Sequence, residues 1–159
     1  MSVEQESIIA SLTPRSPQTA EEFKKYYFLR WEVLRKPLGR VLGYEADTLN
    51  EEGVHAFIIT PAGEVIATGR IYLENKNIAR ARSMAVHPSW QRKGLGAKIL
   101  DFLENSALQL KCRQIVLNAR FNAKSFYEAN GYTCTGISTL EWGYYKHFEM
   151  IKNLPGHDF

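Results

Sequence analysis

The sequence predicts a mixed α/β fold in which one mostly antiparallel sheet is flanked by helices. Three apolar segments separated by short turns, residues 54–60, 64–73 and 78–87, predict an antiparallel meander in the middle of the chain. Helical and strand patterns alternate after this meander. The predicted order is β-α-β-β-β-α-β-α-β-β. No internal repeat or long linker divides it, so we expect a single domain over residues 1–159.

The N-terminal third predicts one strand and one helix. Residues 7–12 (SIIASL) are typical of a first strand, and two prolines follow them. A helix should open at Gln18 or Thr19 and run to about Arg35, where Pro37 and Gly39 stop it. Its apolar side is expected to consist of Phe23, Tyr26, Tyr27, Leu29, Trp31, Val33 and Leu34. Residues 40–53 are expected to be irregular and acidic, with Glu45, Asp47, Glu51 and Glu52.

The C-terminal half predicts two helices and three strands. Apolar residues recur at helical spacing from Ile99 to Leu110, directly after a glycine-bearing turn. Residues 114–118 (QIVLN) are typical of a buried strand, and residues 122–130 of a short helix that Gly131 ends. The last two strands are expected at residues 133–140 and 144–151.

Composition narrows the classes of function. The chain has 159 residues, of which 45% are hydrophobic and 23% charged, as in ordinary globular proteins. Its net charge of +3 suits an anionic ligand but does not indicate a nucleic-acid binder. Cys112 and Cys134 form no disulfide framework and no metal-ligand pattern. Without a signal peptide or an apolar run of roughly 20 residues, we expect a soluble cytoplasmic protein with no membrane partner.

The turn QRKGLGA, residues 91–97, predicts a phosphate site. It lies between a strand and a helix, so backbone N–H groups are free at a helix N-terminus, where the helix dipole also favours an anion. Gly94 and Gly96 remove side chains that would keep a phosphate from the backbone, and Arg92 and Lys93 add positive charge. A nucleotide P-loop is excluded because no G-x-x-x-x-G-K-[ST] string occurs. A Rossmann turn is excluded because Ile99 stands where the third glycine is needed.

Two motifs resemble those of the Gcn5-related N-acetyltransferases, the GNAT superfamily. Q-R-K-G-L-G-A is similar to that family's [QR]-x-x-G-x-[GA] loop, and LNARFNAKSFYEANGY, residues 117–132, resembles its segment that ends in F-Y-x-x-x-G-[FY]. The predicted element order resembles the family along nearly the whole chain. The resemblance implies acetyl transfer from acetyl-CoA to an amine by direct attack in a ternary complex.

The resemblance also implies where coenzyme A binds. The strand that ends at Met84-Ala85-Val86 would splay from residues 114–118, and the exposed backbone groups would bond the pantetheine arm. The pyrophosphate would be wrapped by Gln91, Arg92, Lys93, Gly94, Leu95, Gly96 and Ala97. The remaining cofactor contacts would come from Asn118, Asn122 and Phe126, although a plain core role for Phe126 fits the pattern equally well.

The resemblance places Tyr127 near the thioester sulfur. A thiolate leaves during transfer, and a phenol with a pKa near ~10 can donate a proton to a thiolate whose pKa is near ~8.5. The alternative is a packed tyrosine whose hydroxyl is satisfied within the protein.

The sequence does not single out the general base that would remove a proton from the amine. Several family members use a glutamate on the strand before the turn, but that strand here reads IARARS. Proton loss through water toward Glu74, Glu141 or His147 remains open, and His147 is the candidate because its strand should face the cleft. His87 is expected at a strand end, and His55 and His157 carry no signal.

The acceptor is expected to be a small-molecule amine rather than a protein lysine, because no long peptide-binding insertion is evident. A homodimer is an expectation from the family, whose members often pair through late strands. Two alternatives stay open: a non-catalytic acyl-CoA-binding or sensing module, and a different acyl donor such as succinyl- or propionyl-CoA.

Overall fold

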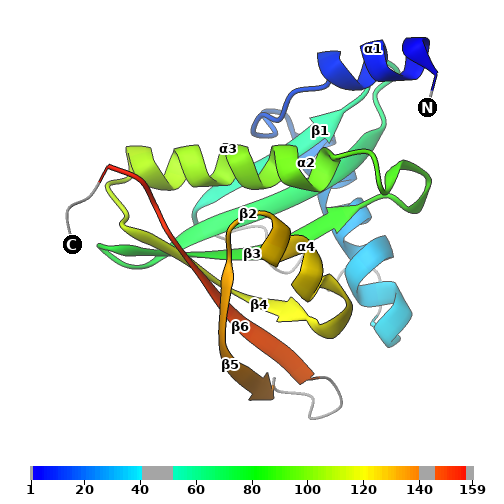
Figure 1. The fold of residues 1–159 in the computed structure, drawn as a ribbon. Helices are drawn as coiled ribbons and strands as arrows, with labels where there is room; N and C mark the ends of the chain where they lie inside the picture. Colours follow the sequence, from blue (N-terminus) through cyan, green and yellow to red (C-terminus); the bar gives the residue numbers. More distant parts are fainter. Residues whose placement is uncertain (1, 41–51, 140–145, 157–159) are drawn as a thin grey trace. The chain divides into compact units, whose positions relative to one another are not determined.

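A computed structural model of the chain describes residues 2–40, 52–139 and 146–156. It contains a six-stranded sheet with the strand order β1-β2-β3-β4-β6-β5 (Figure 1). The strands are β1 Val54–Ile59, β2 Val65–Asn75, β3 Ile78–Val86, β4 Gln114–Arg120, β5 Thr133–Thr139 and β6 Lys146–Asn153. β3 and β4 pair in parallel, whereas β4 with β6 and β5 with β6 are antiparallel. The predicted fold class, a mixed α/β fold with a mostly antiparallel sheet and flanking helices, is confirmed.

The chain forms two compact units. The first comprises Met1–Arg70 and Ser83–Leu103, and the second comprises Ile71–Arg82 and Glu104–Phe159. Strands β2 and β3 and helix α3 (Leu95–Gln109) each contribute residues to both units.

The predicted first strand is wrong, because Val3–Ser11 forms helix α1. Ser2 and Gln5 make a reciprocal capping box, in which each side chain bonds the other residue's backbone N–H at 3.1 Å. This start signal and the helix-forming residues after it outweigh the strand preference of Ile8-Ile9. The extended segment comes later: Arg15 forms an isolated antiparallel bridge with Phe57, with hydrogen bonds of 3.1 and 2.8 Å.

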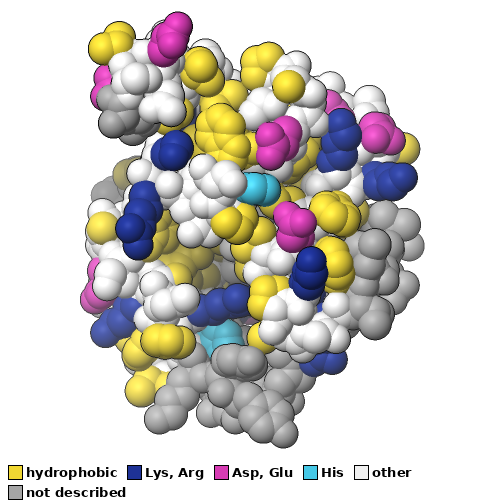
Figure 2. Space-filling view, turned by 90° about the vertical axis from the view of Figure 1, so that its right-hand side faces the viewer, with side chains coloured by type: hydrophobic (Ala, Val, Ile, Leu, Met, Phe, Trp, Pro, Cys, Tyr) yellow, Lys and Arg dark blue, Asp and Glu magenta, His cyan; other side chains and the backbone are white. Residues whose placement is uncertain are grey.

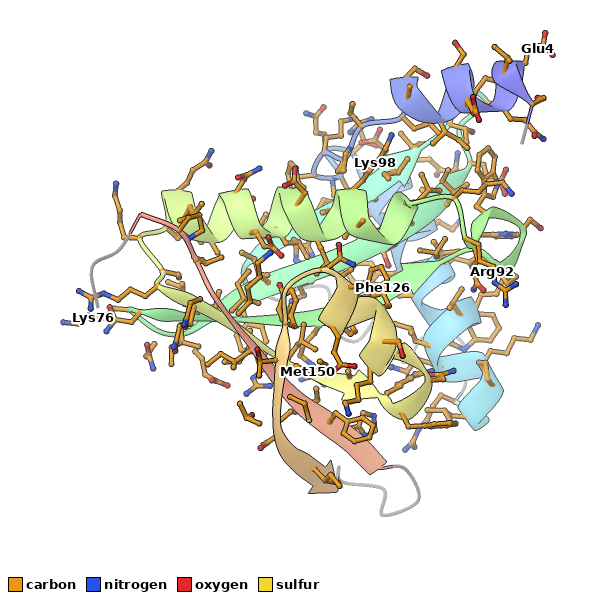
Figure 3. All side chains as sticks on the ribbon, viewed as in Figure 1. Glu4, Lys76, Arg92, Lys98, Phe126 and Met150 are labelled. Atoms are coloured by element: carbon orange, nitrogen blue, oxygen red, sulfur yellow. The ribbon has the colours of Figure 1, made fainter. Side chains whose placement is uncertain are left out.

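Lys98 of α3 holds the end of α1 in the first unit. Its amine donates hydrogen bonds to the carbonyls of Ile9 and Leu12, the latter at 2.8 Å. Figure 3 shows Lys98 pointing away from α3. A lysine at the C-terminal end of a helix satisfies carbonyls that have no intrahelical partner.

The predicted first helix is confirmed as α2 (Ala20–Arg30) with two irregular extensions. Thr19 is its N-cap and accepts a hydrogen bond from the N–H of Glu22 at 3.1 Å. A π-helical turn (η1, Trp31–Arg35) and a 3₁₀ turn (η2, Lys36–Leu38) follow, and Gly39 ends the helix at φ 75°. The buried side of α2 packs into a cluster that contains Tyr26, Tyr27, Leu29, Phe57 and Val65.

Gly69 of β2 allows close packing of the first unit's core. A Cβ at this position would lie 2.5 Å from Cγ2 of Ile99 and 2.7 Å from Sδ of Met84. It would also lie 3.0 Å from Cδ1 of Leu103. Because Gly69 has no side chain, α3 can lie directly against β2 at this position.

The second unit is built on β4, which alternates buried and half-buried residues. Ile115, Leu117 and Ala119 are buried, as is Met150, which is paired with Leu117. The predicted helix over 122–130 is shorter: a 3₁₀ turn (η5, Phe121–Ala123) precedes α4 (Lys124–Ala129), which connects β4 to β5 (Figure 1).

Glu104 organises a polar network in the second unit. It accepts hydrogen bonds from the hydroxyl of Tyr132 at 3.0 Å and from the amine of Lys152 at 2.9 Å. Lys152 also donates to the carbonyl of Asn130 at 2.9 Å, next to Gly131, whose φ is 92°. This network fixes the turn that ends α4.

Several predictions fall outside the described residues: most of the acidic stretch, including Glu45, Asp47 and Glu51, together with Glu141 and His157. Cys112 and Cys134 are both free. Among the described residues, none of the helices has the length and apolar character needed to span a bilayer.

Candidate functional site

The parallel pairing of β3 with β4 is short. It joins Ile78 to Gln114, Ala79 to Ile115 and Arg80 to Val116. Although Ala81–Arg82 and Leu117–Asn118 belong to the same unit, they form no further pair. The β4 peptide groups beyond Val116 thus lack a β3 partner, and the ladder ends before Met84-Ala85-Val86, the part of the strand that the family resemblance implies is splayed.

Ser83 interrupts β3 directly after this point. Its φ of 58° lies in the left-handed region, which costs a residue other than glycine about 1–3 kcal/mol. In the first unit, the hydroxyl of Thr68 donates a hydrogen bond to the Ser83 carbonyl at 3.0 Å and so holds this conformation. The strand then continues through Met84, Ala85 and Val86.

The segment after β3 is a compact turn. Pro88–Trp90 forms a 3₁₀ turn (η4), in which Nδ1 of His87 accepts a hydrogen bond from the N–H of Ser89 at 3.1 Å. His87 is therefore a strand-end residue, as predicted. Gln91 has a role that its motif does not reveal, because its side-chain amide donates to the carbonyl of Val86 at 3.1 Å. The glutamine ties the turn to the end of the strand.

Helix α3 begins directly after this turn, and its first backbone N–H groups have no intrahelical partner. The first intrahelical bond runs from the N–H of Lys98 to the carbonyl of Gly94 at 3.2 Å. The N–H groups of Leu95, Gly96 and Ala97 precede it, and no described side chain caps them. Leu95 is fully buried and anchors the helix start, so the free groups are held in place.

Two backbone positions in this turn adopt left-handed angles. Arg92 has φ 62° and Gly94 has φ 79°, and a Cβ on Gly94 would meet no protein atom within 4 Å. Within the protein, Gly94 is therefore required for its backbone angle rather than for space. Figure 3 shows Arg92 at this turn, where its exposed cation adds to the positive end of the helix dipole.

Tyr127 is the most buried candidate of the second unit. It is 7% exposed and packs edge-on against Phe126 and Tyr132, with ring centroids 5.1 and 5.7 Å away. Burial raises the pKa of its hydroxyl above the ordinary value of a tyrosine, and the positive charge of Arg120 lowers it in part. Unlike Tyr132, Tyr127 has no hydrogen-bond partner for its hydroxyl among the described residues.

The other predicted contacts of the second unit lie on β4, η5 and α4. Asn118 is half-buried on β4, opposite Glu149 of β6. Asn122 is exposed on η5, and Phe126 is 36% exposed on α4 (Figure 3). The exposure of Phe126 favours the cofactor-facing role over the plain core role.

His147 does not lie on the same face of β6 as α4. The ring of Phe148 is covered by the amine of Lys124 of α4, 4.8 Å from the ring centroid, and side chains alternate along a strand. His147 therefore lies on the opposite face, paired with Arg120 of β4. On the face of the molecule that Figure 2 shows, basic, acidic and histidine side chains are interspersed with hydrophobic ones. Tyr127 and His147 are thus presented from opposite sides of the β4–β6 ladder.

Among the described residues, no free carboxylate is identified in place of the missing glutamate on β3. Arg80 pairs with Glu74, with Nε to Oε1 at 2.5 Å, so the carboxylate of Glu74 is engaged in an ion pair. Arg120 is the residue that sequence reasoning missed. Its signal was a charged residue at the end of a buried strand, directly after Ala119.

Comparisons with known proteins agree with this geometry. The model of the acetyltransferase (GNAT) domain matches residues 52–134. The chain is 24% identical over 133 residues to the uncharacterized N-acetyltransferase YjcF of Bacillus subtilis, covering 84% of this chain and 94% of that protein. It is 30% identical over 93 residues to the glucosamine 6-phosphate N-acetyltransferase of Candida albicans, covering 54% and 62%.

A solved structure supports the fold. The aminoglycoside 6′-N-acetyltransferase complexed with coenzyme A superposes with a TM-score of 0.77 at 12% identity, over 93% of this chain and 99% of that one. The family match covers more than half of the chain and includes both the turn before α3 and helix α4. The chain belongs to the GNAT family of acetyltransferases, as its two motifs predict.

Proposed function

We propose that this protein moves an acetyl group from acetyl-CoA to the primary amine of a small molecule, within the single domain that the sequence predicts. The observation that carries the proposal is the start of α3. Three N–H groups that no described side chain caps lie at this helix start, which buried Leu95 anchors, and they follow a turn that bears Arg92 and Lys93. Such a helix start suits a pyrophosphate better than a neutral ligand.

The unpaired stretch of β4 fits the other part of the donor. Peptide groups beyond Val116 have no ladder partner on the β3 side, and the pantetheine arm of coenzyme A carries two amides that can bond to them. The donor thioester supplies an acyl carbon that a neutral amine can attack, with a thiolate as the leaving group. Positioning both reactants supplies a large part of the rate enhancement.

Tyr127 is proposed as the acid. As the C–N bond forms and the C–S bond breaks, its hydroxyl donates a proton to the departing sulfur, and solvent later restores that proton. Burial keeps the pKa of Tyr127 high, so the phenol is protonated and available at neutral pH. The cation of Arg120 offsets negative charge that develops nearby.

Proton loss from the amine is proposed to run through water toward His147. His147 lies on the face of β6 opposite α4, so it would receive a proton from the side away from Tyr127. Because they lie on opposite sides of the ladder, Tyr127 can protonate the leaving sulfur while His147 receives the proton of the amine.

The second candidate function is a binding module that holds acyl-CoA without turnover. The observation that favours it is the absence of a carboxylate along the described β3, where arginines stand at positions 80 and 82. Both functions require acetyl-CoA binding, so binding must be tested separately from turnover.

Thermal unfolding with acetyl-CoA, with NAD and ATP as controls, tests the binding step. A ligand at a hundred times its Kd adds about 2.7 kcal/mol of stability, which gives a clear shift. Thiol release with a panel of amines then tests turnover. A higher melting temperature with acetyl-CoA, but no thiol release with any amine, would favour the binding module. An unchanged melting temperature with millimolar acetyl-CoA would refute the proposed donor.

A further inference from the structure

The second unit has a sheet face that is unlike its buried face. Side chains on one side of the strands are apolar and buried: Ala79, Ala81, Ile115, Leu117, Ala119 and Met150. Alternation along each strand places a different set on the other side. That set is half-buried or exposed and mostly polar: it contains Val116 and Ile151 but also Tyr72, Arg80, Arg82, Asn118, Arg120, His147 and Glu149.

The positive charges of this face gather where β3 and β4 stop pairing. Arg80, in the last pair, is neutralised by Glu74 at 2.5 Å. Arg82, two residues further along β3, is exposed and has no ion-pair or hydrogen-bond partner among the residues that the structure describes. Continuing the parallel register by two residues brings Arg82 level with Asn118.

The acidic groups of this face do not cancel Arg82. The carboxylate of Glu74 is already bound to Arg80. The carboxylate of Glu149 lies over Gly136, with Oε2 3.3 Å from the position of a Cβ there, so it leans toward β5 at the edge of the sheet. Among the described residues, no carboxylate therefore neutralises the Arg82 guanidinium, which lies where the central strands stop pairing.

We propose that the acceptor carries an oxyanion, a phosphate or a carboxylate, within a few bonds of its amine, and that Arg82 with Asn118 binds that oxyanion. This deepens the proposed function and rests on it. A guanidinium binds oxyanions through paired N–H donors, and the side-chain amide of Asn118 can add another. A purely cationic amine would meet like charge at the same place.

The same arrangement bears on the missing base. A cation close to the bound amine favours the neutral amine over the ammonium form. Pairing with Arg82 would thus offset the acceptor's own oxyanion, which otherwise favours the ammonium form, so that the proton can pass to water and then to His147 without a carboxylate on β3.

Binding to protein saturated with free coenzyme A tests this proposal without turnover. Calorimetric titrations in a buffer free of phosphate would use matched pairs of amines whose oxyanion is close to the nitrogen: phosphoethanolamine against ethanolamine, and glycine against glycinamide. We expect the anionic member of at least one pair to bind about ten-fold more tightly or better, as for charge-assisted hydrogen bonds. The pair that discriminates identifies the oxyanion as phosphate or carboxylate.

Two variants test whether Arg82 is the residue that binds the oxyanion. Arg82→Gln should reduce the preference for the anionic amine to within about three-fold, whereas Lys76→Gln, which removes the same charge from an exposed turn, should preserve it. Arg82→Gln should also keep the thermal shift with acetyl-CoA. Equal binding of neutral and anionic amines, equal losses in both variants, or no binding of any anionic amine would overturn the proposal. Failure of the proposed function would appear separately, as loss of the acetyl-CoA shift in the wild-type protein.

Discussion

Replacing Gly69 with alanine should destabilise the protein through one methyl group. The new Cβ would lie 2.5 Å from Cγ2 of Ile99, 2.7 Å from Sδ of Met84 and 3.0 Å from Cδ1 of Leu103, all closer than normal contact. Overpacking of this kind costs about 1–3 kcal/mol. Gly69 does not have a left-handed φ, so alanine fits its backbone and recovers about 0.4–1 kcal/mol by restricting the unfolded chain. The net loss should be about 1–2 kcal/mol.

Urea unfolding gives the free energy directly, and the melting temperature should fall by about 2–4 °C for each kcal/mol in a protein of this size. Gly136→Ala is the matched control, because the nearest atom to its Cβ is the flexible end of Glu149 at 3.3 Å. Ile99→Leu removes the Cγ2 methyl group that the new Cβ meets, so it should recover part of the loss in the double variant. Because Ile99 lies one turn into α3, Gly69→Ala should also raise the KM for acetyl-CoA.

A loss in Gly136→Ala as large as that in Gly69→Ala would show that the effect is not overpacking. An unchanged stability in Gly69→Ala would mean that α3 does not lie against β2 at the distance described.

Three further predictions test the candidate site and the first unit. Gly94→Ala should raise the KM for acetyl-CoA in thiol-release assays and cost about 1 kcal/mol of stability, because φ 79° is unfavourable for alanine although space is free; an unchanged KM would argue against the phosphate turn. Tyr127→Phe should lower kcat by about a hundred-fold or more while acetyl-CoA still raises the melting temperature. The control Tyr132→Phe loses a hydrogen bond to Glu104 and should lower stability rather than kcat, so equal kcat values for Tyr127→Phe and wild type would refute the acid role. Two N–H groups of Arg15, at 3.0 and 2.6 Å, lower the pKa of Glu22 from 4.5 to about 2, so the ion pair stabilises the fold above pH 4.5 and this contribution is lost as the pH falls through 2. Urea unfolding from pH 6 to pH 2 should show a steeper loss in wild type than in Glu22→Gln, and parallel curves would contradict it.

The sequence by itself determined the features that depend on local patterns. The observed elements agree with three such signals: Thr19 before a helical run, Gly39 and Gly131 after helices, and the apolar run QIVLN that became β4. These signals work because capping and the hydrophobic pattern act within a few residues. The two motifs around Gly94 and Tyr127 likewise predicted the family. The sequence misled at residues 7–12, where Ile8-Ile9 favours a strand but the capping box at Ser2 starts a helix.

Only the tertiary structure decided which partners the candidate residues have. Tyr127 and Tyr132 look alike in the sequence, yet Tyr132 is bound to Glu104 and Tyr127 has a free hydroxyl among the described residues. The two arginines of β3 look alike as well, but Arg80 is neutralised by Glu74, whereas Arg82 has no ion-pair partner in the part of the chain that the structure describes. These differences arise because partners come from other strands and helices, and the register that brings them together depends on packing of the whole sheet rather than on neighbours in the chain.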